Sequence, residues 1–97
     1  MTNLRERYNC HIGYSGHEVT MIPCVLAAMM GAVVIERHIT LDHNMWGTDQ
    51  NSSLEIDGMD KLIRRLSIIE SIFVFLLTSP ICFEDFFPKD STRLIVF

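Results

Sequence analysis

The sequence has little positive charge and no long uninterrupted hydrophobic run. It carries 8 lysines and arginines against 12 aspartates and glutamates, a formal net charge of −4. Proteins that bind nucleic acid or anionic membrane surfaces usually present a basic patch. The most apolar stretch, residues 68–83, is interrupted by Glu70 and Pro80 and is shorter than the roughly 20 residues of a membrane-spanning helix. We therefore expect neither a nucleic-acid partner nor a membrane partner.

Cysteine is also scarce. The three cysteines, Cys10, Cys24 and Cys82, lie far apart and form no Cys-x-x-Cys pair. An odd number of cysteines without a secretory signal indicates a reducing compartment. The first residues, MTNLRERYNCHIG, lack the charged-then-apolar order of a signal peptide. We predict three buried thiols and a cytoplasmic location.

Apolar residues are abundant. Hydrophobic residues make up 48% of the chain against 21% charged residues, and the mean hydropathy is +0.24. This composition argues against intrinsic disorder. A chain of 97 residues forms one small domain at most and buries a smaller share of its surface than a typical domain. We expect a marginal core and some uncovered apolar surface.

The order of patterns along the first third of the chain predicts an α/β fold. Residues 1–9 are typical of the end of an amphipathic helix, and residues 11–14 are short and apolar enough for a buried strand. The Ala- and Met-rich run at 21–30 predicts a buried helix. The β-branched run at 32–36 predicts a second strand, buried on both faces of a parallel sheet.

The rest of the chain predicts a loop, a helix and a tail. Residues 40–53 are polar and indicate a long loop, and apolar residues recur from Ile56 to Leu66 at the spacing of a helix of about four turns. Beyond Ile72 neither a helical nor an alternating period is present, so we predict an irregular apolar tail. Two parallel strands need several neighbours and cover on both faces. The β-α-β-α unit is therefore expected to be part of a larger fold.

Two pairs of polar residues follow the predicted strands. Ser15 and His17 have the same parity, so both project to one side of the chain. Glu36 and His38 are related in the same way after the second strand. Because parallel strands joined by one crossover helix end at the same edge of a sheet, we expect the two histidines to lie close enough to bind one metal ion.

Other interpretations of these residues stay open at this point. Each histidine could instead be a structural residue with satisfied hydrogen bonds. Two imidazoles with serine, carboxylates and water nearby suit a divalent ion such as manganese, but the ligand types do not exclude zinc or iron. Glu36 could orient a histidine, bind a substrate, or pair with Arg37. Away from these residues, His11 and His43 have no partner at a useful spacing, and Trp46 is expected to pack the long loop rather than to stack against a ligand.

Three blocks of the sequence carry these polar residues. They are IGYSGHE at residues 12–18, IERHITLDHNMWGTDQ at 35–50 and SSLE at 52–55. Together they resemble the sialic acid synthase family over roughly residues 4–72. The resemblance implies a fragment of a (β/α)₈ TIM barrel that contains strands seven and eight of the parent fold. We accordingly divide the chain into a partial barrel domain at residues 1–72 and a divergent tail at 73–97.

The resemblance also implies an activity. Members of the family condense phosphoenolpyruvate with an N-acetylated hexosamine, typically N-acetylmannosamine. His17 and His38 match the family's ligands for a divalent metal, usually manganese, which polarises the sugar aldehyde as a Lewis acid. Ser15 is implied to help hold phosphoenolpyruvate. Glu36 and Asp49 are implied to contact the sugar or the attacking water, and they are the catalytic candidates.

The sequence also departs from the family pattern. Strands one to six of such a barrel supply the groups that bind the phosphate and carboxylate of phosphoenolpyruvate, and this chain has no match to them. We therefore predict that the chain is inactive alone. One alternative is a non-catalytic fragment that pairs with a separately encoded barrel portion and completes it. Another is a protein with no preserved role, whose uncovered edges drive self-association.

Overall fold

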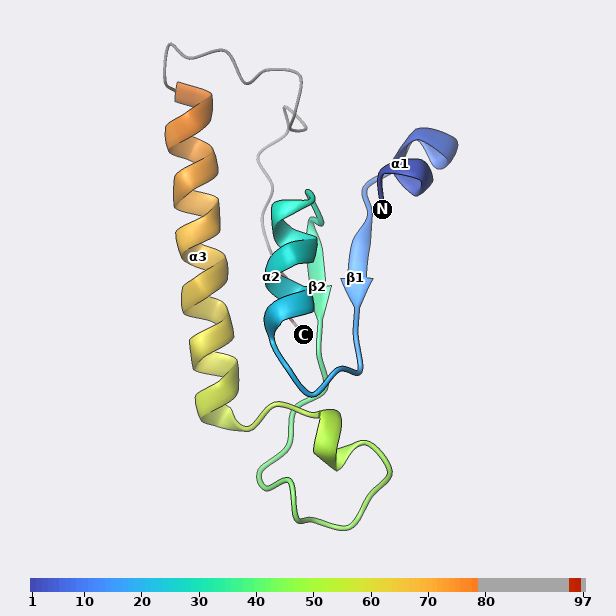
Figure 1. Cartoon of the computed structure of the whole chain (residues 1–97), viewed down its shortest axis with the longest axis vertical. Helices are drawn as coiled ribbons and strands as arrows, with labels where there is room; N and C mark the ends of the chain where they lie inside the picture. Colours follow the sequence, from blue (N-terminus) through green and yellow to red (C-terminus); the bar gives the residue numbers. More distant parts are fainter. Residues whose placement is uncertain (79–94, 97) are drawn as a thin grey trace.

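The computed structural model describes residues 1–78 and 95–96. The elements in chain order are α1 (Thr2–Tyr8), β1 (Gly13–Ser15), α2 (Ile22–Met29), β2 (Val34–Glu36), the short 3-10 helix η1 (Gln50–Ser52), α3 (Ile56–Thr78) and β3 (Ile95–Val96). The strands form one parallel sheet in the order β1-β2-β3, and Figure 1 shows β1 and β2 side by side. The α/β class and the strand-helix-strand-helix order from β1 to α3 are confirmed, and both are compatible with a piece of a barrel-like domain.

The connection between β1 and β2 is helical because residues that start and stop a helix stand at its two ends. Pro23 lies in the first turn of α2, where its missing N–H costs no intrahelical hydrogen bond. After α2, Gly31 has a φ of 84°, a left-handed conformation that glycine adopts at little cost. The N–H of Gly31 donates to the carbonyl of Ala28 at 2.9 Å. The chain then enters β2 directly.

The core lies where α2 packs against β2 and α3. Its buried apolar residues come from α2, β2, α3 and the short segments beside them. They are Cys24, Ala27, Ala28, Ala32, Ile35, Leu54, Leu62 and Leu66. The small side chains of α2 allow this helix to approach the sheet closely, and Ile35 and Leu62 are completely buried. The core is small, and much of the surface of the helices lies outside it.

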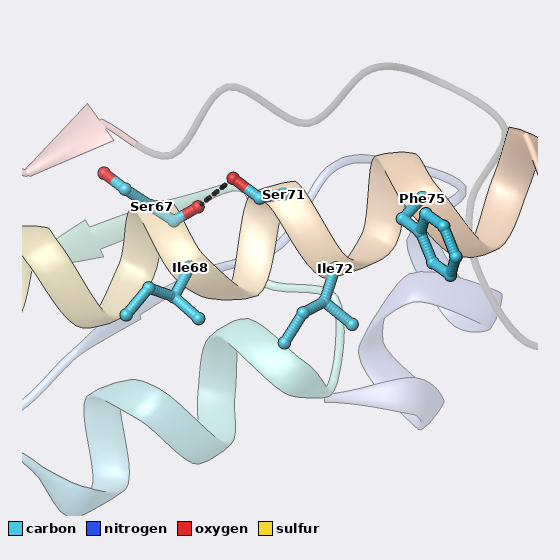
Figure 2. Close-up of a pocket in the computed structure, with 5 residues that line it drawn as sticks. All are labelled: Ser67, Ile68, Ser71, Ile72 and Phe75. Atoms are coloured by element: carbon cyan, nitrogen blue, oxygen red, sulfur yellow. Dashed lines mark hydrogen bonds between the residues drawn. The ribbon is translucent and has the colours of Figure 1, made fainter.

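Large apolar side chains are exposed on α2 and along the second half of α3. On and beside α2 they are Leu26, Met29 and Met30, and on α3 they include Ile68, Ile72 and Phe75. The three α3 side chains line a shallow pocket with Ser67 and Ser71 (Figure 2). The expectation of uncovered apolar surface is confirmed. Within residues 1–78 and 95–96, no helix is both long and apolar enough to cross a membrane.

The segment after Ile72 is more regular than the sequence indicates. α3 continues without a break to Thr78 and so crosses the predicted boundary between residues 72 and 73. An amphipathic period is absent there because residues 73–77 are all apolar. A helix can still form, since no glycine or proline lies between Ile72 and Pro80. β3 also belongs to the predicted irregular tail and pairs in parallel with β2. The rest of that tail, residues 79–94 and 97, lies outside the described residues.

The prediction of three buried thiols is correct for one cysteine and wrong for another. Cys24 is completely buried on α2, and burial raises the pKa of its thiol, which keeps it protonated and unreactive. Cys10 is exposed because it lies in the short connection between α1 and β1. Cys82 lies outside the described part of the chain.

Candidate functional site

The carboxyl ends of β1 and β2 lie side by side because the two strands are parallel and paired in register. Ser15 is opposite Glu36, and the Ser15 hydroxyl donates a hydrogen bond to the Glu36 carboxylate. His17 and His38 stand two residues further along each chain segment. Their rings meet edge to face with centroids 4.6 Å apart and an interplanar angle of 89°. The juxtaposition of the histidines that strand parity predicts is present.

The third member of the cluster comes from the long loop between β2 and α3. In Figure 1 the arrowheads of β1 and β2 point toward this loop, which contains η1. One ligand atom from each of His17, His38 and Asp49 lies within 4.8 Å of the other two. His17 and Asp49 are exposed and His38 is half-buried, so solutes reach all three. Asp49 therefore lies at the same edge as the histidines, as predicted.

Glu36 lies between the serine and one of the histidines. One carboxylate oxygen accepts the hydrogen bond from Ser15, and the other lies 3.8 Å from His38 Nε2. Glu36 forms no ion pair with Arg37, since the guanidinium of Arg37 pairs instead with Glu18 at 3.1 Å. Of the three interpretations that the sequence left open for Glu36, the pairing with Arg37 is thus wrong. The carboxylate faces the histidine side of the strand.

Backbone and hydroxyl hydrogen bonds hold the part of the loop that carries Asp49. The Asp49 carbonyl accepts from the hydroxyls of Ser52 and Ser53 at 3.1 Å and 2.7 Å. It also accepts from the backbone N–H of Ser53 at 3.0 Å. These bonds form the turn of η1 and fix the backbone from which the Asp49 side chain projects.

His43 joins the two ends of the same loop, so the prediction that it lacks a partner is wrong. Its Nδ1 atom lies 2.8 Å from the carbonyl oxygen of Gln50, and its Nε2 atom lies 3.8 Å from a carboxylate oxygen of Glu55. That carboxylate also accepts the backbone N–H of His43 at 3.1 Å. Glu55 is 12 residues away in the chain, and no local sequence pattern links the two. Trp46, predicted to pack this loop, is fully exposed.

A buried arginine lies behind the cluster. Arg37 stands between Glu36 and His38, and this parity turns its side chain to the other side of the strand. Only 1% of its surface is exposed. The guanidinium donates to the carboxylate and the backbone carbonyl of Glu18, and to the backbone carbonyl of Ser52 at 2.8 Å. The sequence signal for this network, an arginine directly after an apolar strand, does not indicate its partners.

Tyr14 extends the network from the middle of β1. Its hydroxyl donates to the Glu18 carboxylate, and this hydrogen bond, assisted by burial, raises the pKa of Tyr14 to about 12. The same hydrogen bond lowers the pKa of Glu18, and the nearby charge of Arg37 lowers it further. At neutral pH the network therefore consists of a neutral phenol, a charged carboxylate and a charged guanidinium.

Comparison with known proteins assigns the chain to a family. The model of the NeuB family matches residues 1–74, which include the whole cluster of His17, His38 and Asp49. The chain belongs to the NeuB family. This bears out the resemblance to sialic acid synthases that the sequence blocks indicate.

Several curated relatives of this NeuB-family chain are synthases of N-acetylneuraminate 9-phosphate, N,N'-diacetyllegionaminic acid or pseudaminic acid. It is 46% identical over 59 residues to the N-acetylneuraminate-9-phosphate synthase of Homo sapiens, a match that covers 61% of this chain and 16% of that protein. It is 36% identical over 70 residues to the N,N'-diacetyllegionaminic acid synthase of Campylobacter jejuni, covering 72% of this chain and 21% of that one. A pseudaminic acid synthase of the same organism is 31% identical over 71 residues, 73% of this chain and 21% of that protein.

These matches cover only a small part of each relative. The chain spans 16% of the length of the human synthase. No solved structure gives a significant match. Membership of the NeuB family therefore rests on sequence, and the geometry of the cluster is an independent observation made on this chain.

Proposed function

We propose that this chain provides the metal-binding edge of a sialic acid synthase active site and is not catalytically active alone. The parent reaction is the condensation of phosphoenolpyruvate with N-acetylmannosamine or a related N-acetylated sugar. The observation that carries the proposal is the convergence of His17, His38 and Asp49 at the carboxyl ends of two parallel strands. In a (β/α)₈ barrel the active site lies at that end of the strands, and β1 and β2 would be strands seven and eight.

The cluster fits a divalent ion, which we propose to be Mn²⁺. Two imidazole nitrogens and a carboxylate oxygen are donors that manganese, zinc and iron accept. Donors bound to one ion at about 2.0–2.2 Å are separated by up to roughly 4 Å. The present separations, all within 4.8 Å, therefore require only small side-chain rotations. A bound ion would supply Lewis-acid polarisation of the sugar aldehyde.

The neighbouring polar groups are suited to holding the substrates. Ser15 and Glu36 share a hydrogen bond and project from the same side of the strands as the two histidines. We assign to Ser15 a contact with phosphoenolpyruvate, and to Glu36 and Asp49 contacts with the sugar or the attacking water. Glu36 is also close enough to His38 to restrict the orientation of its ring.

Inactivity of the isolated chain follows from incomplete substrate capture. Holding two reactants in register contributes about 7–11 kcal/mol when it is complete. The anionic phosphoenolpyruvate needs cationic partners, and the arginine nearest to the histidines, Arg37, is buried on the other side of β2 and already bonded to Glu18. We propose that the remaining partners belong to barrel strands that this chain does not match.

Metal binding and turnover are measured separately to test this function. The purified chain is titrated with Mn²⁺ while the electron paramagnetic resonance signal of the free ion is followed, and it is then supplied with phosphoenolpyruvate and N-acetylmannosamine. We expect one bound ion per chain, loss of binding in His38→Ala, and no nine-carbon sugar acid above the level of that variant. Absence of binding by the unmodified chain contradicts the metal site, and turnover above the His38→Ala control contradicts inactivity.

A second candidate function is pairing with a separately encoded barrel portion. The exposed apolar side chains of α2 and α3 and the position of β1 at one edge of the described sheet favour it. Coexpression with the portion of a related synthase that precedes the matched region tests this candidate. Recovery of a stable complex with synthase activity supports complementation, whereas self-association of the chain without a complex supports the protein with no preserved role.

A further inference from the structure

One buried side chain is bonded to the segments that carry both histidines. Arg37 immediately precedes His38 in the chain. Its guanidinium donates to the Glu18 carboxylate at 3.1 Å and to the Glu18 backbone carbonyl, and Glu18 immediately follows His17. The guanidinium thus crosses from the end of β2 to the turn after β1, behind the point where the two rings meet.

The same guanidinium reaches the loop of the third candidate ligand. Arg37 Nη2 donates to the Ser52 carbonyl at 2.8 Å. Ser52 in turn donates to the Asp49 carbonyl, from its backbone N–H at 3.2 Å and from its hydroxyl at 3.1 Å. Three segments that lie apart in the sequence are therefore tied to one group, and each supplies one member of the cluster.

The surroundings of Arg37 make these bonds strong and hard to replace. Its exposure is only 1%, whereas the Glu18 side chain is 42% exposed, and hydrogen bonds to a charged group are stronger than neutral ones. The planar guanidinium donates in several directions at once, whereas the ammonium of lysine is a single point of charge. Loss of the guanidinium would leave Glu18 and the Ser52 carbonyl without these donors.

We propose that Arg37 is a positioning residue that fixes the mutual placement of His17, His38 and Asp49. Its side chain leaves the strand on the side opposite to Glu36 and His38, so it touches neither metal nor substrate. The functional meaning of this inference rests on the metal site proposed above, but the geometric claim is independent of metal. Without the guanidinium, the turn after β1 and the Asp49 part of the loop lose their shared anchor to Arg37, and the cluster spreads.

The test compares three variants of the full chain. Arg37→Met removes the donors and keeps an unbranched side chain, Arg37→Lys keeps the charge without the planar fork, and Arg64→Met is the matched control at an exposed arginine bonded to Asp60 on α3. Two quantities are measured: the Mn²⁺ dissociation constant, and the nuclear Overhauser contact between the His17 and His38 rings in the metal-free protein. Contacts between Tyr14 and Ile35 report whether β1 and β2 stay paired.

We expect Arg37→Met to weaken Mn²⁺ binding by about 10- to 100-fold, the range found for outer-shell partners of metal ligands, and to lose the contact between the histidine rings. The strand contacts should persist, Arg37→Lys should be intermediate, and Arg64→Met should match the unmodified chain. An unchanged ring contact and affinity in Arg37→Met overturns the proposal. If Arg37→Met unfolds, Arg37→Lys decides: behaviour identical to the unmodified chain overturns the proposal, and a weakened ring contact supports it.

Failure of the proposed metal site and failure of the positioning role give different experimental results. If the unmodified chain binds no Mn²⁺ but Arg37→Met loses the ring contact, the metal site is wrong and the positioning role stands. If the unmodified chain binds Mn²⁺ and Arg37→Met binds it equally well with the ring contact intact, the metal site stands and the positioning role is wrong.

Discussion

His17 and His38 meet edge to face, with ring centroids 4.6 Å apart, because Ser15 and Glu36 are paired two residues before them. The contact is therefore a consequence of strand register. A shift of the register by one residue would turn the residue of opposite parity toward this side of the sheet, and on β2 that residue is Arg37. The same register decides which side chains form the cluster and which form the network behind it.

Asp49→Asn should weaken Mn²⁺ binding by more than about tenfold. The amide keeps the size of the side chain and removes its negative charge, and a direct ligand should matter at least as much as the outer-shell partners whose loss costs 10- to 100-fold. Isothermal titration calorimetry measures the dissociation constant. Asp42→Asn is the control, because Asp42 lies in the same loop and bonds to Asn44. Equal affinities of the two variants would contradict the assignment.

Tyr14→Phe should lower the free energy of unfolding by about 1 kcal/mol, the usual net value of one hydrogen bond. The substitution removes the bond to Glu18 and keeps the aromatic ring. Urea denaturation at neutral pH measures the difference. Tyr8→Phe is the matched control, since the exposed ring of Tyr8 lies against Arg7 on α1. No difference between the two variants would show that the bond to Glu18 contributes nothing.

The stabilisation by Tyr14 should disappear at high pH. Its pKa in the folded chain is raised to about 12, above the ordinary value of about 10, so the folded state holds the proton more tightly. The contribution is complete below pH 10 and is lost as the pH rises through 12. The difference in unfolding free energy between the unmodified chain and Tyr14→Phe should therefore shrink over that interval. A constant difference would contradict the predicted shift.

The stabilisation by Glu18 should be lost at low pH, whereas that by Tyr14 is lost at high pH. Its folded-state pKa is lowered, chiefly by the hydrogen bond from Tyr14, so the folded state favours the ionised carboxylate. The contribution is present above the unfolded pKa of about 4.3 and is lost as the pH falls through the lowered folded value. Glu18→Gln should flatten the acid side of the stability profile. Glu70→Gln, at an exposed position of α3, is the matched control.

Two glycines should respond to alanine with opposite signs. Gly31 has a φ of 84°, and a Cβ atom there would lie 2.7 Å from Arg5 Nη2, so Gly31→Ala should destabilise the chain by at least about 1 kcal/mol. Gly58 lies in α3, where the nearest atom to an added Cβ is 3.5 Å away. Gly58→Ala should stabilise by about 0.5–1 kcal/mol. Thermal unfolding of both variants measures the two shifts.

Local patterns predicted the parts of the fold that depend on neighbouring residues. The β-branched run before Glu36 and the apolar run after Met21 correspond to β2 and α2. Parity together with a parallel crossover predicts that His17 lies beside His38. These rules depend on residues only a few positions apart or on the general geometry of the β-α-β unit.

The network behind the site could not be predicted in that way. Arg37 is 19 residues from Glu18 and 15 residues from Ser52, and no period connects these positions. The extension of α3 was missed because an amphipathic pattern is absent where a helix is apolar on all sides. The exposure of Trp46 follows from the path of the loop, which depends on the contacts of His43 with Gln50 and Glu55.

The pairing of β3 with β2 has a consequence for the order of folding. β1 and β2 meet across a separation of 21 residues, whereas Val34 and Ile95 are roughly 60 residues apart along the chain. Closing a loop about three times as long costs about 1 kcal/mol more in chain entropy. The chain loses this entropy before the two-residue strand β3 forms any hydrogen bonds with β2. The register that brings the histidines together should therefore form early, and β3 should join the sheet last.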